Sequence, residues 1–165
     1  ITSPVVAHSS LGGYSVSFTG GALTTHTVSA TSVNTDLYLD GKDYVAVPQT
    51  WINIPVNLGN LGATTASTIT VTLTKPSDVS LRSFTPDATC LGNTCTWTLS
   101  AANLAFLGAG KVSFQASLPP SAMGTEYLLN LNISSPETDG VPANNALQIR
   151  LVSAAPYFLP VVAKE

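Results

Sequence analysis

The chain has 165 residues, of which 44% are hydrophobic and only 9% are charged, and its formal net charge is -3. The 6 basic residues are scattered and form no basic stripe, which excludes the electrostatic surface of a nucleic-acid-binding protein. No run of eighteen apolar residues occurs, so no membrane insertion is predicted. The length suits one domain that buries its own core.

The first 34 residues are predicted to form an extension ahead of the main domain. Val5 and Val6 lie in a short extended segment. Farther along, Tyr14, Val16 and Phe18 alternate with serines, a pattern that predicts a strand with one apolar face. The chain starts without methionine, as a secreted protein does after loss of its signal peptide or as an expressed fragment does.

Residues 36–47 are predicted to form a hairpin. Two apolar stretches there flank Asp40 and Gly41, a dipeptide that tolerates positive φ in a tight turn. The next strand runs from Trp51 to Val56. Pro55 within it has no amide hydrogen to donate, which predicts an edge position or a bulge at that point.

The clearest strand signal covers residues 68–74. Ile69, Val71 and Leu73 alternate there with threonines. β-Branched residues on both faces favour a pleated strand over a helix. The segment is therefore predicted to have one face in the core and one face in water.

The rest of the chain continues as short strands separated by turns. Strands are predicted at residues 79–84, 96–99, 111–118, 126–134 and 146–152. Residues 101–107 alone show helical spacing, and they are enough for a single turn. About ten short strands without a long helix predict an all-β sandwich with antiparallel neighbours.

Cys90 and Cys95 are the only cysteines, and a Gly-Asn turn lies between them. This spacing favours a disulfide across a hairpin, which requires an oxidising compartment. A zinc site would need two more soft ligands, whereas His8 and His26 are the only histidines. We therefore expect a disulfide and a secreted, extracellular or cell-surface protein; a pair of buried thiols is the alternative.

Several sequence elements between residues 36 and 152 occur in a familiar order. They are Asp36-Leu37, the aromatic strand from Trp51 to Gly59, Ile69–Pro76, the cysteine pair with Thr96–Leu99, Leu107–Gly110 and Glu137–Ala146. In this order they resemble the bacterial Ig-like surface repeat family of unknown function, the DUF11 type. The resemblance implies an Ig-like antiparallel β-sandwich over residues 35–153, and not an enzyme. Residues 1–34 and the apolar tail at 154–165 are then additions to the family unit.

No residue pattern predicts catalysis or a bound cofactor. The sequence has no Gly-x-Ser-x-Gly elbow, and both histidines lie in its amino-terminal quarter. Two acidic groups are candidates for calcium ligands, although neither has the spacing of an EF-hand loop. They are Asp36, Asp40 and Asp43, and Glu137 with Asp139. The alternative, which we expect, is that these residues belong to turns and solvated loops.

Apolar residues at both chain ends indicate how the domain would be used. An uncovered apolar strand recruits another chain, so a terminal segment could complete a sheet in a neighbouring subunit. The sequence thus predicts a filament, pilus-like or surface-layer subunit that binds copies of itself or another surface protein. The residues predicted to carry this self-association are Val5, Val6, Tyr14, Val16, Phe18, Tyr157, Phe158, Leu159 and Val161. The alternative is that they form ordinary strands of a monomer.

A second hypothesis is a carbohydrate-binding or adhesion module of a larger secreted enzyme, with a glycan as its partner. Its stacking residues would be Trp51, Trp97, Tyr38 and Tyr44. Such a module needs at least two aromatic side chains exposed on one flat face or at one loop end. An assembly subunit needs an open groove or a projecting strand, and an enzyme needs a pocket with converging polar groups.

Overall fold

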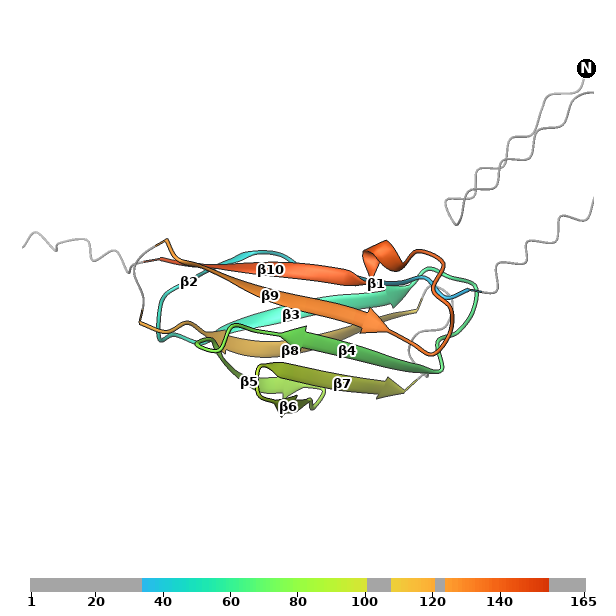
Figure 1. Cartoon of the computed structure of the whole chain (residues 1–165), viewed down its shortest axis with the longest axis horizontal. Coiled ribbons are helices and arrows are strands. Elements are labelled where there is room, and N and C mark those ends of the chain that lie inside the picture. Colours follow the sequence, from blue (N-terminus) through green and yellow to red (C-terminus); the bar gives the residue numbers. More distant parts are fainter. Residues whose placement is uncertain (1–33, 101–107, 121–123, 155–165) are drawn as a thin grey trace, which may run out of the picture.

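The computed structural model describes residues 34–100, 108–120 and 124–154 (Figure 1). Within these ranges the chain forms ten strands and one 3-10 helix, η2 (Pro142–Asn144). The strands are β1 (Leu37–Asp40), β2 (Tyr44–Ala46), β3 (Ile52–Asn60), β4 (Thr68–Thr74), β5 (Ser80–Thr85), β6 (Thr89–Leu91), β7 (Thr94–Ser100), β8 (Ala109–Ser117), β9 (Glu126–Ser134) and β10 (Ala146–Ser153). The predicted amino-terminal strands, the helical turn at 101–107 and the tail from residue 155 lie outside the described residues.

The strands form two sheets, which confirms the predicted all-β sandwich. One sheet has four strands in the order β1-β3-β8-β5, and the other has six in the order β2-β10-β9-β4-β7-β6. Figure 1 shows β4, β9 and β10 in one layer, with β3 and β8 in the layer behind them. Consecutive strands such as β3 and β4 belong to different sheets, so the chain repeatedly crosses between the layers and closes the interior from both sides.

One hydrophobic core fills the space between the sheets. The inner strand β4 directs Ile69, Val71 and Leu73 into this core, and each of these side chains is 0% exposed. β9 alternates in the same way, with every second side chain buried. Burying an aliphatic side chain of this kind contributes about 1.5–3 kcal/mol. The alternation in the sequence therefore fixes which face of each strand turns inward.

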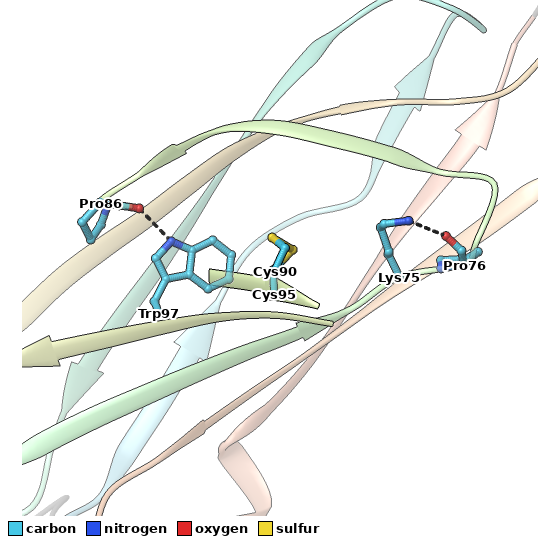
Figure 2. Close-up of a disulfide and its surroundings, with 6 residues drawn as sticks. All are labelled: Lys75, Pro76, Pro86, Cys90, Cys95 and Trp97. Atoms are coloured by element: carbon cyan, nitrogen blue, oxygen red, sulfur yellow. Dashed lines mark hydrogen bonds between the residues drawn. A yellow bond between two sulfur atoms is a disulfide. The ribbon is translucent and has the colours of Figure 1, made fainter. Parts of the chain in front are cut away.

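Trp97 on β7 is among the largest side chains that are fully buried. Its ring centroid lies 5.7 Å from that of Phe84 and 6.0 Å from that of Phe114. The indole Nε1–H donates to the carbonyl oxygen of Pro86 at 3.0 Å, so the polar atom of the ring is not left unsatisfied (Figure 2). Trp97 thus connects β7 to residues of the opposite sheet and to the loop after β5.

Cys90 and Cys95 form a disulfide between β6 and β7 (Figure 2). The two residues are direct partners in this antiparallel strand pair. All three residues of β6 are exposed, so few side-chain contacts hold this edge strand. The disulfide therefore attaches β6 to β7 where buried side-chain contacts do not.

The predicted hairpin over residues 36–47 is wrong. β1 pairs with β3 in the four-stranded sheet, whereas β2 pairs with β10 in the six-stranded sheet. Gly41 lies where the chain crosses, and a Cβ at this position would stand 3.0 Å from Leu147 Cδ2 on β10. The glycine therefore permits a close approach of the crossing chain to β10 and does not form a hairpin turn.

The same crossing explains a parallel strand pair that the sequence did not predict. β2 and β10 run in the same direction, whereas every other strand pair among the described residues is antiparallel. Only residues 41–43 separate β1 from β2. So short a link takes the chain across to a sheet about 10 Å away without reversing its direction.

β3 is an inner strand for only half of its length. Its second half pairs with β1, and the last pair joins Asp40 to Asn57. Pro55 lies beyond this pair, opposite Ser113 of β8 on the other side. Its missing amide hydrogen is tolerated because no described strand lies beside β3 on the β1 side at this point. Pro55 therefore occupies a local edge within a strand that is otherwise internal.

A polar network closes one end of the sandwich. Asp139 accepts hydrogen bonds from the backbone amide of Leu37 at 3.0 Å and from Asn145 Nδ2 at 3.2 Å. Asp36 accepts a hydrogen bond from Asn144 Nδ2 at 2.8 Å. These contacts attach the loop before β10 to the start of β1, which is distant in the sequence.

Glu137 attaches the same loop to the residues that precede β4. Its Oε1 accepts a hydrogen bond from the backbone N–H of Ser67 at 3.0 Å. Hydrogen bonding from the Ser67 side chain lowers the pKa of Glu137, and partial desolvation opposes this effect. The folded chain therefore favours the ionised form of this carboxyl group.

Replacing Leu73 with alanine should lower the free energy of unfolding by about 2–5 kcal/mol, because the side chain is fully buried and leaves a cavity. The matched control is Thr74→Ala, one residue farther along β4 and exposed, which should change stability by no more than about 1 kcal/mol. Urea denaturation measures both variants. Equal losses would contradict the assignment of the core and water faces of β4.

Replacing Glu137 with glutamine should destabilise the protein near neutral pH but not in acid. The lowered folded-state pKa means that the carboxylate stabilises the fold above its unfolded-state pKa, about 4.3. That contribution is lost as the pH falls through the lower folded-state value. Urea midpoints for the wild type and E137Q should differ near pH 7 and converge in acid, once the pH lies below the folded-state pKa. A pH-independent difference would show that charge has no part in this contact.

Candidate functional site

The outer surface of the four-stranded sheet gathers side chains suited to binding. Along β3, the even-numbered residues from Ile54 to Leu58 are buried, so the odd-numbered residues from Asn53 to Asn57 face outward. β8 alternates in the same way. We call this surface the β3 face, and its residues are Trp51, Asn53, Pro55, Asn57, Arg82, Lys111, Ser113 and Gln115.

The strand register aligns these side chains in rows across the sheet. Asn53 on β3 lies opposite Gln115 on β8, which in turn lies opposite Arg82 on β5. Asn57 lies opposite Lys111 in another row. Directly opposed side chains have Cβ atoms about 4.5–5.5 Å apart. A partner resting on this face would therefore contact three strands at once.

Trp51 immediately precedes β3 and is 37% exposed. The guanidinium carbon of Arg82 lies 3.9 Å from the centroid of its ring system. Arg82 Nε also donates to Gln115 Oε1 at 2.9 Å, which fixes the guanidinium over the indole. A cation over an exposed aromatic ring contributes about 0.5–1 kcal/mol. Trp51 is thus open to solvent and yet held in one position.

The chemistry of the β3 face is that of binding. Its charged members are Arg82 and Lys111, and carboxamide and hydroxyl groups supply most of its other polar atoms. Tryptophan and arginine are enriched among the residues that dominate protein interfaces. The face offers apolar contact at Trp51 together with hydrogen bonding at the neighbouring amides, and it places no nucleophile beside a base.

The other aromatic residues predicted to stack on glycans are less accessible. Trp97 is 0% exposed and belongs to the core. Tyr38 is half-buried, and a Cβ at Gly59 would overlap its ring. Tyr44 is half-buried and packs against the core. Among these candidates only Trp51 is exposed, so the described residues lack the expected pair of exposed aromatics.

The first acidic group considered for calcium does not converge on one point. Asp36 accepts its hydrogen bond from the η2 segment. Asp43 Oδ2 forms an ion pair with Arg150 Nη2 at 3.2 Å. Asp40 Oδ2 accepts a hydrogen bond from Asn57 Nδ2 at 3.4 Å. The three carboxylates thus have separate partners, as expected of turn and loop residues.

The second acidic group, Glu137 with Asp139, belongs to the contacts at the end of the sandwich. Each carboxylate accepts a hydrogen bond from a backbone amide of another part of the chain. Across residues 34–100, 108–120 and 124–154, no group of three or more His, Cys, Asp and Glu side chains is placed to hold a metal ion. Glu137 and Asp139 therefore connect this loop to the residues before β4 and to the start of β1.

The edges of both sheets are short or irregular. The edge strands β2 and β6 have three residues each, and β1 has four. β5 is longer, but its register with β8 shifts between Arg82 and Thr85, and Ser83 has a φ of 53°. Short and bulged edges discourage pairing with another chain. Beside the short strand β2, however, residues 146–149 of β10 have no described neighbouring strand on that side, so part of this edge is open to strand addition.

The residues predicted to carry self-association, from Val5 to Phe18 and from Tyr157 to Val161, lie outside the described residues. The structure therefore says nothing about donated strands. In the part of the chain that is described, no helix is long and apolar enough to cross a membrane.

No protein-family model matches this sequence, and no curated protein matches it. Solved structures do match. The CARDB domain of a Pyrococcus furiosus protein, in complex with di-metal ions, has a TM-score of 0.52 at 16% identity, with 83% of this chain and 100% of that chain covered.

Two matches are chains of type I cohesin–dockerin complexes. One, from Clostridium thermocellum, has a TM-score of 0.53 at 9% identity, with 75% of this chain and 98% of that chain covered. The other is the third cohesin ScaC from Acetivibrio cellulolyticus in complex with the ScaB dockerin. Its TM-score is 0.51 at 12% identity, with 72% of this chain and 99% of that chain covered.

At such low identities the similarity is one of fold. The neighbours are β-sandwich domains, which agrees with the two sheets described above. The resemblance of residues 36–152 to the DUF11 type stays a prediction. The chain is similar in fold to CARDB and cohesin domains.

Proposed function

We propose that this chain is a non-catalytic, extracellular module that binds another protein through the β3 face. The Trp51–Arg82 pair carries the proposal. An exposed indole is held by a guanidinium that is itself hydrogen-bonded to Gln115. Interfaces concentrate their binding energy in a few residues of this kind, and side chains that are already ordered lose little entropy on binding.

The extracellular compartment is supported by the chemistry of the chain. The Cys90–Cys95 disulfide requires an oxidising environment. The solved cohesins with a similar fold were captured in complex with dockerins, so this type of sandwich supports protein binding in other chains. In this chain the proposed binding surface follows from the residues of the β3 face and not from the cohesins.

The partner in this proposal is another copy of the chain or a different surface protein. Self-assembly into a filament, pilus-like fibre or surface layer by donated terminal strands is the mechanism that the sequence predicts. Its acceptor would be a sheet edge. The outermost described strands are short or bulged, and residues 146–149 of β10 are the open stretch that could receive a donated strand. We place the contact on the β3 face, where the Trp51–Arg82 pair lies, and treat strand donation as the rival mechanism.

A glycan is the second candidate partner, as in a carbohydrate-binding module of a larger secreted enzyme. The observation that favours it is the exposed indole of Trp51, which could stack on a sugar ring. Asn53 and Gln115 would then bond to the sugar hydroxyl groups. A single exposed aromatic gives less stacking than the flat array expected of such a module.

Photo-crosslinking tests the β3 face directly. Benzoylphenylalanine would replace Asn53 in the full chain, and the protein would be irradiated in its native extracellular setting. We expect a protein adduct of defined mass, because Asn53 lies beside the Trp51–Arg82 pair across the strand register. Mass spectrometry of the adduct distinguishes a second copy of the chain from a different protein.

The matched control carries the same group at Thr98, which is exposed on β7 in the other sheet. Thr98 should give little or no adduct. Adding Trp51→Ala to the Asn53 probe should reduce the adduct at least tenfold, as expected for the loss of an interface anchor. Equal crosslinking from both sheets, or an adduct that survives Trp51→Ala, would remove the β3 face as the binding surface.

Removing residues 1–18 separates strand donation from binding on the face. If the amino-terminal strand is donated, the truncated chain loses assembly and becomes prone to aggregation, because an acceptor edge is left open. Binding through the β3 face predicts the same assembly state for the full and truncated chains. Light scattering with negative-stain microscopy measures that state. Loss of assembly in a truncated chain that remains folded would decide for strand donation.

A further inference from the structure

A surface hollow of about 310 Å³ lies where β1 leaves the four-stranded sheet. It exists because β1 ends opposite Asn57 and the chain then crosses to the other sheet. The first half of β3, before Asn57, is therefore left without a described neighbouring strand on that side. The residues that line the hollow are Asp40, Gly41, Lys42, Tyr44, Pro55 and Asn57.

The hollow is protected from being filled by another strand. Pro55 has no amide hydrogen to offer to a strand that would extend the sheet there. Gly41 adds no side chain to the hollow, and its lack of a Cβ allows the chain to lie close to Leu147 on β10. The space therefore stays open to small molecules while it resists a peptide strand.

Several polar groups around the hollow keep hydrogen-bonding capacity. Asn57 Nδ2 and Asp40 Oδ2 are 3.4 Å apart, which is a long hydrogen bond that leaves both groups able to bind a ligand. The hydroxyl oxygen of Tyr44 is buried, so it is not among the groups that a ligand in the hollow would contact.

The lining is apolar in part and has no net charge. The rings of Tyr44 and Pro55 supply apolar surface. Lys42 Nζ lies 5.5 Å from the centroid of the Tyr44 ring, and Asp40 brings the opposite charge. An anion would meet the carboxylate and a cation would meet the ammonium group, so the lining favours a neutral ligand that bears hydroxyl groups.

We propose that the hollow binds one residue of a neutral sugar. A sugar ring has C–H groups that can rest on Pro55 or on the Tyr44 ring. Its hydroxyl groups both donate and accept, which matches the carboxylate of Asp40 and the carboxamide of Asn57. The volume lies near the lower end of the range for ligand pockets, about 300–1,000 Å³, and suits a single ring.

The hollow shares Pro55 and Asn57 with the β3 face but lies at the end of that face away from Trp51. Trp51 lies six residues before Asn57 along an extended strand, which is roughly 20 Å away. If Trp51→Ala does not reduce crosslinking, the sugar-binding proposal is unaffected. If no sugar binds in the hollow, the proposed protein interface is unaffected.

Two-dimensional nitrogen–proton NMR of the full chain tests the proposal. The probes are the methyl glycosides of glucose, galactose, mannose and N-acetylglucosamine, each titrated to millimolar concentration. We expect saturable shifts at the Asn57 side-chain amide and at the backbone amides of residues 40–44 with at least one probe. The absence of saturable shifts with all four probes, or shifts confined to Trp51 and Asn53, would overturn the proposal.

Matched variants then assign the contacts. Asn57→Ala should weaken sugar binding about tenfold, because it loses a hydrogen bond to a ring hydroxyl. The control Thr98→Ala, exposed on β7 in the other sheet and outside the hollow, should bind as the wild type does. Wild-type affinity in Asn57→Ala would remove the hollow as the site.

A pentasaccharide of the best-binding sugar distinguishes a polymer from a free sugar as the source of the ligand. Tighter binding of the pentasaccharide than of the methyl glycoside would assign the hollow to one residue within a glycan chain. Equal affinity would assign it to a single sugar or a chain end. Exclusion of the pentasaccharide would assign it to free sugars.

Discussion

The crossing of the chain between the two sheets at residues 41–43 is the constraint on which much of the surface depends. It favours a residue without a side chain at Gly41, because a Cβ there would lie 3.0 Å from Leu147 Cδ2 on β10. It makes β2 run parallel to β10, since so short a link does not reverse the chain. It also ends the pairing of β1 at Asp40 and exposes an edge of β3. One local geometry thus produces both the strand order and the hollow beside it.

The sequence predicted the parts of this fold that depend on local alternation. β4 and β9 have the predicted ranges, 68–74 and 126–134, because each has one apolar residue in every two and must bury that face. It did not predict the separation of β1 from β2. Asp40 with Gly41 looks like a hairpin turn when only neighbouring residues are considered. Pairing with β3 and β10 is determined by residues far along the chain, which local patterns do not contain.

The two tryptophans show how far a candidate site can be predicted in the same way. Trp97 alternates with threonines in the same register as Cys95 and Leu99, which places it on the apolar side of its strand. Trp51 is offset by one position from Ile52 and from the apolar residues that follow at every second position, which places it on the polar side of the strand. Alternation alone therefore separates the buried indole from the exposed one. The position of Arg82 over Trp51 could not be predicted, because β8 lies between their strands and only the sheet order brings them together.

A chain with so few charged residues has little electrostatic means of keeping its sheet edges from pairing with other chains. Here the edge strands are short, one register is bulged, and the gap beside β3 contains a proline. A partner at a sheet edge pairs mainly with the backbone and contacts few side chains. A partner on a sheet face contacts only side chains. With its outermost strands short or bulged, the sandwich of the proposed function would recognise its partner through the side chains of the β3 face. Exchanging outward-facing residues such as Trp51 would then alter the partner without disturbing the alternation that holds the core together.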